Sequence, residues 1–108
     1  MDTRRTGGPL SGLNGRALKV TGQGGVPTSG VSAVIMNLAS VTPAGAGFVT
    51  AWPSGENRPT TSNLNFVSGR NVANLAVVPV GADGKVMLYS GSGGSLNVIA
   101  DVVGYVAG

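Results

Sequence analysis

Residues 72–90, with the sequence VANLAVVPVGADGKVMLYS, decide the fold class of this chain. Residues 72–80 and 86–90 are short apolar runs rich in β-branched side chains, which are typical of β-strands. Between them lies Asp83-Gly84, a pair that tolerates positive φ and favours a tight type I′ turn. This stretch therefore predicts two strands joined as a β-hairpin.

The same pattern of short apolar runs and turn residues continues outward along the rest of the chain. Further strands are predicted at residues 17–21, 31–41, 48–52, 60–66 and 96–106. No segment has the capped 3.6-residue period of an amphipathic helix. About seven short strands predict an all-β, single-domain β-sandwich over residues 1–108, with immunoglobulin-like or jelly-roll topology.

Two of these strands carry an indication of their place in a sheet. Residues 31–41 are largely apolar at both odd and even positions, which predicts a central strand covered on both faces. Pro79 has no N–H to donate to a neighbouring strand, so residues 72–80 are predicted to lie at a sheet edge or to end there.

The small number of charged residues limits the partners that the chain can have. Only 10% of the residues are charged, seven basic and four acidic, whereas about a quarter is usual in globular proteins. The basic residues are scattered and few aromatic residues lie among them, so no nucleic-acid partner is predicted. No apolar run approaches the roughly 20 residues of a membrane-spanning helix, so no membrane insertion is predicted.

The chain is also poor in the residues that perform catalysis. It has no His and no Cys, which removes the commonest general base, the commonest metal ligand and thiol nucleophiles. A serine nucleophile would need Lys19 or Lys85 as its base, and neither lysine lies in a recognisable motif. We therefore expect no enzymatic activity, no catalytic residue, no metal and no cofactor.

One loop has the composition of a sugar-binding site. Trp52, the only tryptophan, precedes a polar loop that contains Glu56, Asn57 and Arg58. An aromatic ring can stack on a pyranose while polar groups hydrogen-bond its hydroxyls. In the alternative interpretation, Trp52 fills the end of the core and the loop is merely solvated. Both interpretations remain open at this point.

Several short motifs occur in an order that carries a family resemblance. They are Asp2-Thr3-Arg4, Gly24-Gly25-Val26-Pro27, Arg58-Pro59-Thr60, Ser62-Asn63-Leu64-Asn65-Phe66, Val78-Pro79-Val80-Gly81 and Ile99-Ala100-Asp101-Val102-Val103-Gly104-Tyr105. With these motifs, the chain resembles a repeat domain found in secreted actinobacterial proteins, which opens with Asp-Thr-Arg and closes with Asp-Val-Val-Gly-Tyr.

The resemblance implies a cellular context more than an activity. Members of the family are exported modules, often in tandem, with no assigned chemistry. We therefore expect a secreted or cell-surface location, although residues 1–5 lack the apolar core of a signal peptide. Family members have a further apolar stretch before Asp-Thr-Arg, where this sequence has Met1. This difference suggests that a strand is missing or that a neighbouring copy supplies one.

The first and last motifs are also expected to contact each other. Asp101 stands among apolar residues, and Arg4 is predicted as its partner in a structural ion pair, which would lower the cost of placing a carboxylate there.

Two functional hypotheses follow from the sequence. One is a structural or self-associating module, such as a spacer or a fibre or particle subunit, with copies of itself or neighbouring repeats as partners. The other is an accessory domain that binds cell-wall or extracellular polysaccharide through the Trp52 loop.

Overall fold

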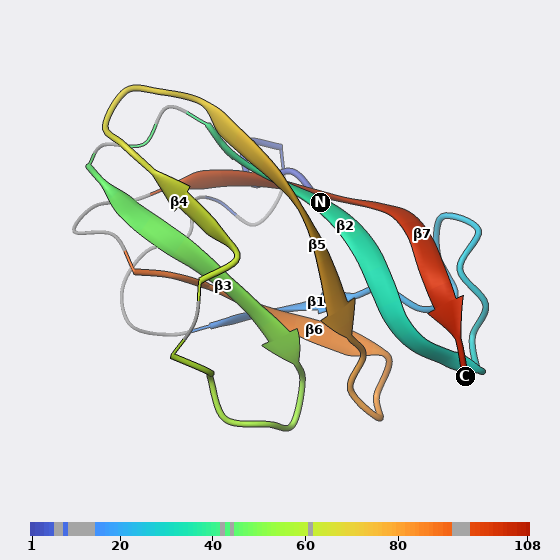
Figure 1. Ribbon diagram of the computed structural model, residues 1–108. Coiled ribbons are helices and arrows are strands. Elements are labelled where there is room, and N and C mark those ends of the chain that lie inside the picture. The colour runs from blue at the N-terminus through green and yellow to red at the C-terminus, as the bar shows by residue number, and fades with distance from the viewer. Residues whose placement is uncertain (6–7, 9–14, 42, 44, 61, 92–95) are drawn as a thin grey trace.

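A computed structural model describes residues 1–5, 8, 15–41, 43, 45–60, 62–91 and 96–108. In these residues the chain forms strands and no helix. The strands are β1 (Arg16–Lys19), β2 (Val31–Val41), β3 (Gly47–Pro53), β4 (Leu64–Phe66), β5 (Val72–Pro79), β6 (Lys85–Ser90) and β7 (Asn97–Ala107). They form two antiparallel sheets with the strand orders β1-β6-β3-β4 and β5-β2-β7 (Figure 1).

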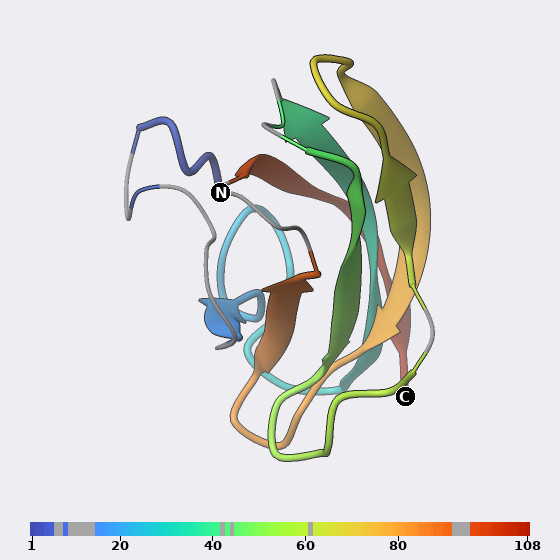
Figure 2. The same cartoon turned by 90° about the vertical axis from the view of Figure 1, so that its left-hand side faces the viewer.

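The apolar core lies between the two sheets. In β2 the even-numbered side chains Val34, Met36 and Leu38 are fully buried, as the two-residue period of a strand requires when one face is covered. The opposite sheet contributes side chains such as Val49 and Leu88, which are equally buried. The two sheets curve around this core (Figure 2), so the predicted all-β sandwich of about seven strands is confirmed.

The strand order brings together segments that are far apart in the sequence. β1 pairs with β6, whereas β2 lies in the other sheet between β5 and β7. In an immunoglobulin constant domain, by contrast, the first two strands are neighbours in one sheet. The predicted positions of two strands are also seen: β2 is central in its sheet, and β5 is an edge strand that ends at Pro79.

The predicted hairpin at Asp83-Gly84 is wrong. A tight turn does form, because Gly84 N donates to Gly81 O (2.9 Å) and Lys85 N donates to the Asp83 carboxylate (3.1 Å). However, the turn connects β5 in one sheet to β6 in the other. Turn residues set where the chain reverses, but burial of each apolar face decides which strands pair.

Two further expectations need correction. β2 is central, but its odd-numbered residues from Ile35 to Val41 are only half-buried, so it is not covered on both faces. The strand predicted at residues 60–66 is shorter, because only Leu64–Phe66 pairs with β3, and residue 61 lies outside the described residues. Before that strand, the Asn63 carboxamide oxygen accepts a hydrogen bond from Ala51 N (2.8 Å), so a side chain replaces a strand contact.

The two sides of the sandwich are closed differently. On one side β4 lies against β5, and Asn74 Nδ2 donates to Asn63 O (2.9 Å). On the other side residues 1–3 run antiparallel to β7: Met1 N donates to Ala100 O (2.8 Å) and Ala100 N donates to Met1 O (2.8 Å). Residues 1–3 therefore lie between β7, at the edge of one sheet, and β1, at the edge of the other.

Candidate functional site

The ring of Trp52 is covered by the loop that follows β3. Val49 and Ala51 of β3 point into the core, so by strand alternation Trp52 lies on the outer face of the four-stranded sheet. Even so, only 8% of Trp52 is exposed. The loop that follows β3 folds back, and the indole N–H donates to Glu56 O (3.0 Å). Trp52 is thus neither an open stacking platform nor part of the core between the sheets.

The other predicted sugar-binding residues lie in this same loop, which contacts Trp52 and Tyr89. Glu56 and Asn57 are exposed. The Arg58 guanidinium lies 3.8 Å from the centre of the Tyr89 ring, in a cation–π contact. Tyr89 is itself 6.2 Å from Phe48, measured between ring centres. The loop therefore contacts two buried aromatic side chains, Trp52 and Tyr89. The ring of Trp52 is not the exposed platform that stacking on a sugar requires.

The predicted ion pair between Arg4 and Asp101 is wrong. Arg4 instead binds Asp2, through Nε to Oδ1 (3.0 Å) and Nη2 to Oδ2 (2.8 Å). The reason is the pairing register. Residues 1–3 run antiparallel to β7 with Asp2 opposite Ile99, so each later residue of this segment lies opposite an earlier residue of β7 and Arg4 is farther from Asp101 than Asp2 is. Asp101 is exposed, opposite Asn37 of β2.

The salt bridge changes the acidity of Asp2. The hydrogen bonds from the Arg4 side chain lower the pKa of the Asp2 carboxyl from 3.8 to about 2. The same contact raises the pKa of Arg4. Asp2 is therefore a structural carboxylate that is ionised at all physiological pH values.

The acidic residues do not assemble into a reactive site. Asp83 accepts hydrogen bonds from Lys85 N and from Ser54 Oγ (both 3.1 Å), whereas Glu56 and Asp101 are exposed. Within the part of the chain that the structure describes, no group of three His, Cys, Asp or Glu side chains could hold a metal ion. The same part contains no helix that is long and apolar enough to cross a membrane.

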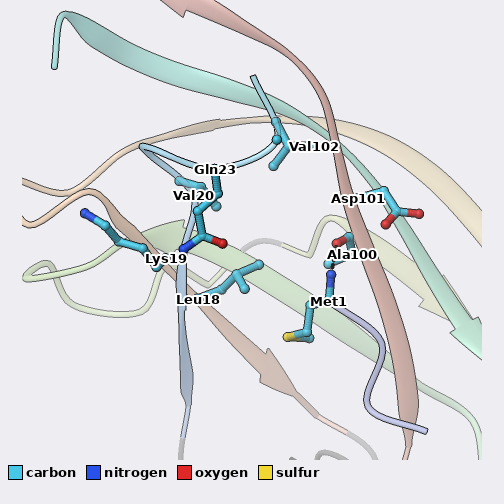
Figure 3. A pocket seen from close by; sticks show the side chains of 9 residues that line it. Met1, Leu18, Lys19, Val20, Gln23, Ala100, Asp101 and Val102 are labelled. Carbon is cyan, nitrogen blue, oxygen red and sulfur yellow. Dashed lines mark hydrogen bonds between the residues drawn. The ribbon is translucent and has the colours of Figure 1, made fainter. Parts of the chain in front are cut away.

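A small cavity of about 260 Å³ lies between Met1, residues 18–24 and residues 100–102 of β7 (Figure 3). It is lined by Met1, Leu18, Lys19, Val20, Gln23, Gly24, Ala100, Asp101 and Val102. Lys19 and Asp101 point away from its centre (Figure 3), and Lys19 Nζ donates to Thr21 Oγ1 (3.0 Å). The cavity has a mixed polar and apolar lining and is slightly smaller than the roughly 300 Å³ at which sites for small molecules begin.

A larger surface was missed by sequence reasoning. The outer side of the sheet β5-β2-β7 carries exposed apolar side chains on all three strands, next to the polar pair Asn37 and Asp101, and we call its apolar part the outer apolar face. Its members are Ile35, Leu75, Val77, Val103 and Val106, of which Leu75, Val77 and Val103 are 60%, 61% and 64% exposed. Asp101 is the only charged residue in these three strands.

The sequence contained a signal for this face. The apolar residues at both odd and even positions of residues 31–41 predict a strand buried on both sides. In a two-layer sandwich, however, each sheet has only one inner side, so the second set of apolar residues faces solvent.

Comparison with protein-family models, curated proteins and solved structures finds no match to this chain. The functional argument therefore depends on the surfaces themselves. Of these, the outer apolar face is the most unusual, because exposed apolar residues on soluble monomers are normally scattered.

Proposed function

We propose that this chain is a non-catalytic, extracellular structural module that associates with copies of itself. The observation that carries the proposal is the outer apolar face. Val77 lies opposite Ile35, and Ile35 lies opposite Gly104, so the apolar surface is continuous from β5 through β2 to β7. Removing such a surface from water is favourable by about 25 cal/mol for each Å² buried.

A second copy is the partner that fits this face best. A face that binds a membrane surface would be expected to carry basic residues beside its apolar ones, and strands β2, β5 and β7 have no lysine or arginine. A sugar-binding face would be expected to show exposed rings beside polar groups. An apolar sheet face can instead pack against the same face of a second copy, as in the two-fold interfaces of most homo-oligomers.

The size of the face indicates how strong one such contact is. Eight residues at about 3.3 Å each, across three strands about 4.8 Å apart, give the whole outer side of the sheet an area on the order of 400 Å², of which the apolar face is a part. A stable interface buries about 800 Å² on each partner. One face alone therefore supports weak association, which tandem copies or a second contact would strengthen.

The extracellular location is part of the proposal. It is supported by the resemblance to secreted repeat domains and by the low proportion of charged residues, 10% of the chain.

The molar mass of the protein, measured by light scattering over a wide concentration range, tests the proposal. We expect the mass to rise with concentration for the unchanged protein. The double variant Leu75→Lys, Val77→Lys should show a smaller rise in mass with concentration, because two ammonium groups would oppose burial of the outer apolar face. Ala17→Lys adds a charge at an exposed position of β1, on the other sheet, and should behave like the unchanged protein. A strict monomer at the highest concentration would refute self-association.

Polysaccharide binding is the alternative function, and its support is weaker now that Trp52 is covered. Retention on insoluble cell-wall polysaccharide distinguishes the two functions, because a self-associating module with no sugar site should not be retained.

A further inference from the structure

One sheet edge in this structure is left without the usual protection. β7 is the last strand of the sheet β5-β2-β7. Its first half is covered, because residues 1–3 pair with residues 98–100. Along residues 102–107, among the residues that the structure describes, β7 pairs only with β2. This segment, which we call the free edge of β7, contains neither a charged residue nor a proline.

The other three edges are protected in ways that natural sheets commonly use. β1 is four residues long and carries Arg16 and Lys19. β5 ends in Pro79, and β4 has three residues and lies against β5. The free edge of β7 thus stands out as the place where another strand could pair.

The direction of the backbone groups identifies the residue at the centre of this edge. Peptide groups of a strand point alternately to its two sides. Val106 O accepts a hydrogen bond from Ser32 Oγ of β2 (3.1 Å), so Val106 faces the neighbouring strand. The N–H and C=O of the preceding residue, Tyr105, therefore face the free edge. A bulge at Val103, where the register with β2 shifts, limits regular pairing to the residues around Tyr105.

We propose that the free edge of β7 pairs with the same edge of a second copy, antiparallel about a two-fold axis at Tyr105. This inference rests on the proposed self-association and names its geometry. In this arrangement the two Tyr105 residues exchange both backbone hydrogen bonds, and Gly104 lies opposite Val106 of the second copy. Two identical strands can pair in this way because an antiparallel pair is symmetric about its centre.

Edge pairing also enlarges the surface available for a further contact. It joins the two three-stranded sheets into one six-stranded sheet, whose outer side is about twice as large. This combined side, on the order of 800 Å², has the size that one partner contributes to a stable interface, so two edge-paired dimers could pack on each other through it. The chain carries a net charge of +3, but the paired segments carry none, so no like charges are brought together at the axis.

A cysteine placed at the axis tests the geometry. The chain has no cysteine of its own, so Tyr105→Cys introduces one thiol per copy. Across a hydrogen-bonded antiparallel pair the Cα atoms lie about 5.5 Å apart, within the roughly 4.4–6.8 Å that a disulfide requires. We expect Tyr105→Cys to form a covalent dimer under mild oxidation, seen by electrophoresis without reductant. Val77→Cys is the matched control. Val77 is also exposed, but it lies on β5, at the opposite side of the sheet from the free edge of β7.

The two cysteine variants give distinct outcomes. Cross-linking of Tyr105→Cys at least tenfold faster than Val77→Cys supports edge pairing. Equal rates, or faster reaction of Val77→Cys, would overturn it in favour of contact between outer apolar faces. Oligomers in light scattering without any Tyr105→Cys dimer would overturn edge pairing and leave self-association standing. A strict monomer without cross-linking would remove both.

A second pair of variants tests the edge without cysteines. Tyr105→Pro removes the N–H that faces the free edge, and proline is tolerated on an edge strand where its missing N–H faces solvent. We expect this variant to lose the dimer while its circular dichroism remains that of the folded chain. Tyr105→Phe keeps the N–H and should dimerise normally. A dimer of unchanged strength in a folded Tyr105→Pro variant would contradict the proposed pairing.

Discussion

Arg4 and Asp2 form a bidentate salt bridge at the start of the chain, with Nε–Oδ1 and Nη2–Oδ2 distances of 3.0 and 2.8 Å. Arg4 N also donates to Asp2 Oδ1 (3.0 Å), so the carboxylate holds the turn that leaves β7. Asp2 itself lies opposite Ile99 of β7. The salt bridge between Arg4 and Asp2 thus helps to hold residues 1–3 against β7, where they cover the first half of its edge.

The salt bridge predicts a specific dependence of stability on pH. The pKa of Asp2 is lowered from 3.8 to about 2 in the folded chain, so the contribution is complete above about pH 4 and is lost as the pH falls through about 2. In Arg4→Gln the pKa of Asp2 should rise toward 3.8, because the guanidinium hydrogen bonds are gone. NMR titration of the Asp2 carboxyl measures this shift. Arg70→Gln removes an exposed charge of the same type, outside the salt bridges of Asp2, and should leave the midpoint unchanged.

Thr3 should contribute more to stability than its size suggests. It is 2% exposed, and its Oγ1 accepts a hydrogen bond from Val98 N (2.8 Å) and donates to Asn97 Oδ1 (3.0 Å). Thr3→Val keeps the shape but leaves the buried Val98 N–H unpaired, so we expect a loss of about 1–3 kcal/mol in the free energy of unfolding. Urea denaturation measures the loss. Thr3→Ser retains the hydroxyl and should lose less; equal losses would show that the hydrogen bond has no role.

Trp52 is predicted to stabilise the fold rather than to bind sugar. Trp52→Ala should lower the free energy of unfolding by about 3–5 kcal/mol, because a covered ring is removed. Trp52→Phe retains most of the buried area and loses the hydrogen bond to Glu56 O, so its loss should be smaller. Thermal unfolding separates these cases. The opposite result would be a Trp52→Ala variant that is as stable as the unchanged protein but is no longer retained on cell-wall polysaccharide.

The existence of most strands could be predicted from the sequence because it depends on local patterns. Apolar runs bounded by glycine and proline locate β2 at residues 31–41 and place five other strands close to their observed bounds. β4 is the least accurate, since Asn63 donates its backbone N–H to Val49 O (2.9 Å) but accepts a hydrogen bond from Ala51 N through its side chain, and the strand pairing goes no further. A two-residue period reports which residues can be buried, but side-chain capping of this kind leaves no periodic signal.

The partners of these strands could not be predicted, because pairing is decided by contacts between distant residues. Asp83-Gly84 forms its turn, yet β5 pairs with β2 and β6 with β3. Arg4 and Asp101 were linked by charge alone, whereas the register of residues 1–3 on β7 leaves Arg4 beside Asp2. The outer apolar face was missed for the same reason: it exists only once three distant strands are assembled.

The turn at Gly84 allows the effects of backbone conformation and of crowding to be separated. Gly84 and Gly24 both have positive φ, 75° and 57°, so an alanine at either position is forced into the left-handed region, at a cost of about 1–2 kcal/mol. A Cβ at Gly24 would meet open space, whereas a Cβ at Gly84 would collide with Thr21 Oγ1 and Lys19 Nζ.

Gly84→Ala should therefore cost more than Gly24→Ala. The extra loss is expected to be about 1–3 kcal/mol, because Thr21 is buried and must move to make room. The same movement would break the hydrogen bond from Lys19 Nζ to Thr21 Oγ1 (3.0 Å). Urea denaturation of the two variants measures the difference directly. If both variants lose the same free energy, crowding at the turn has no effect and the backbone conformation alone explains the glycine.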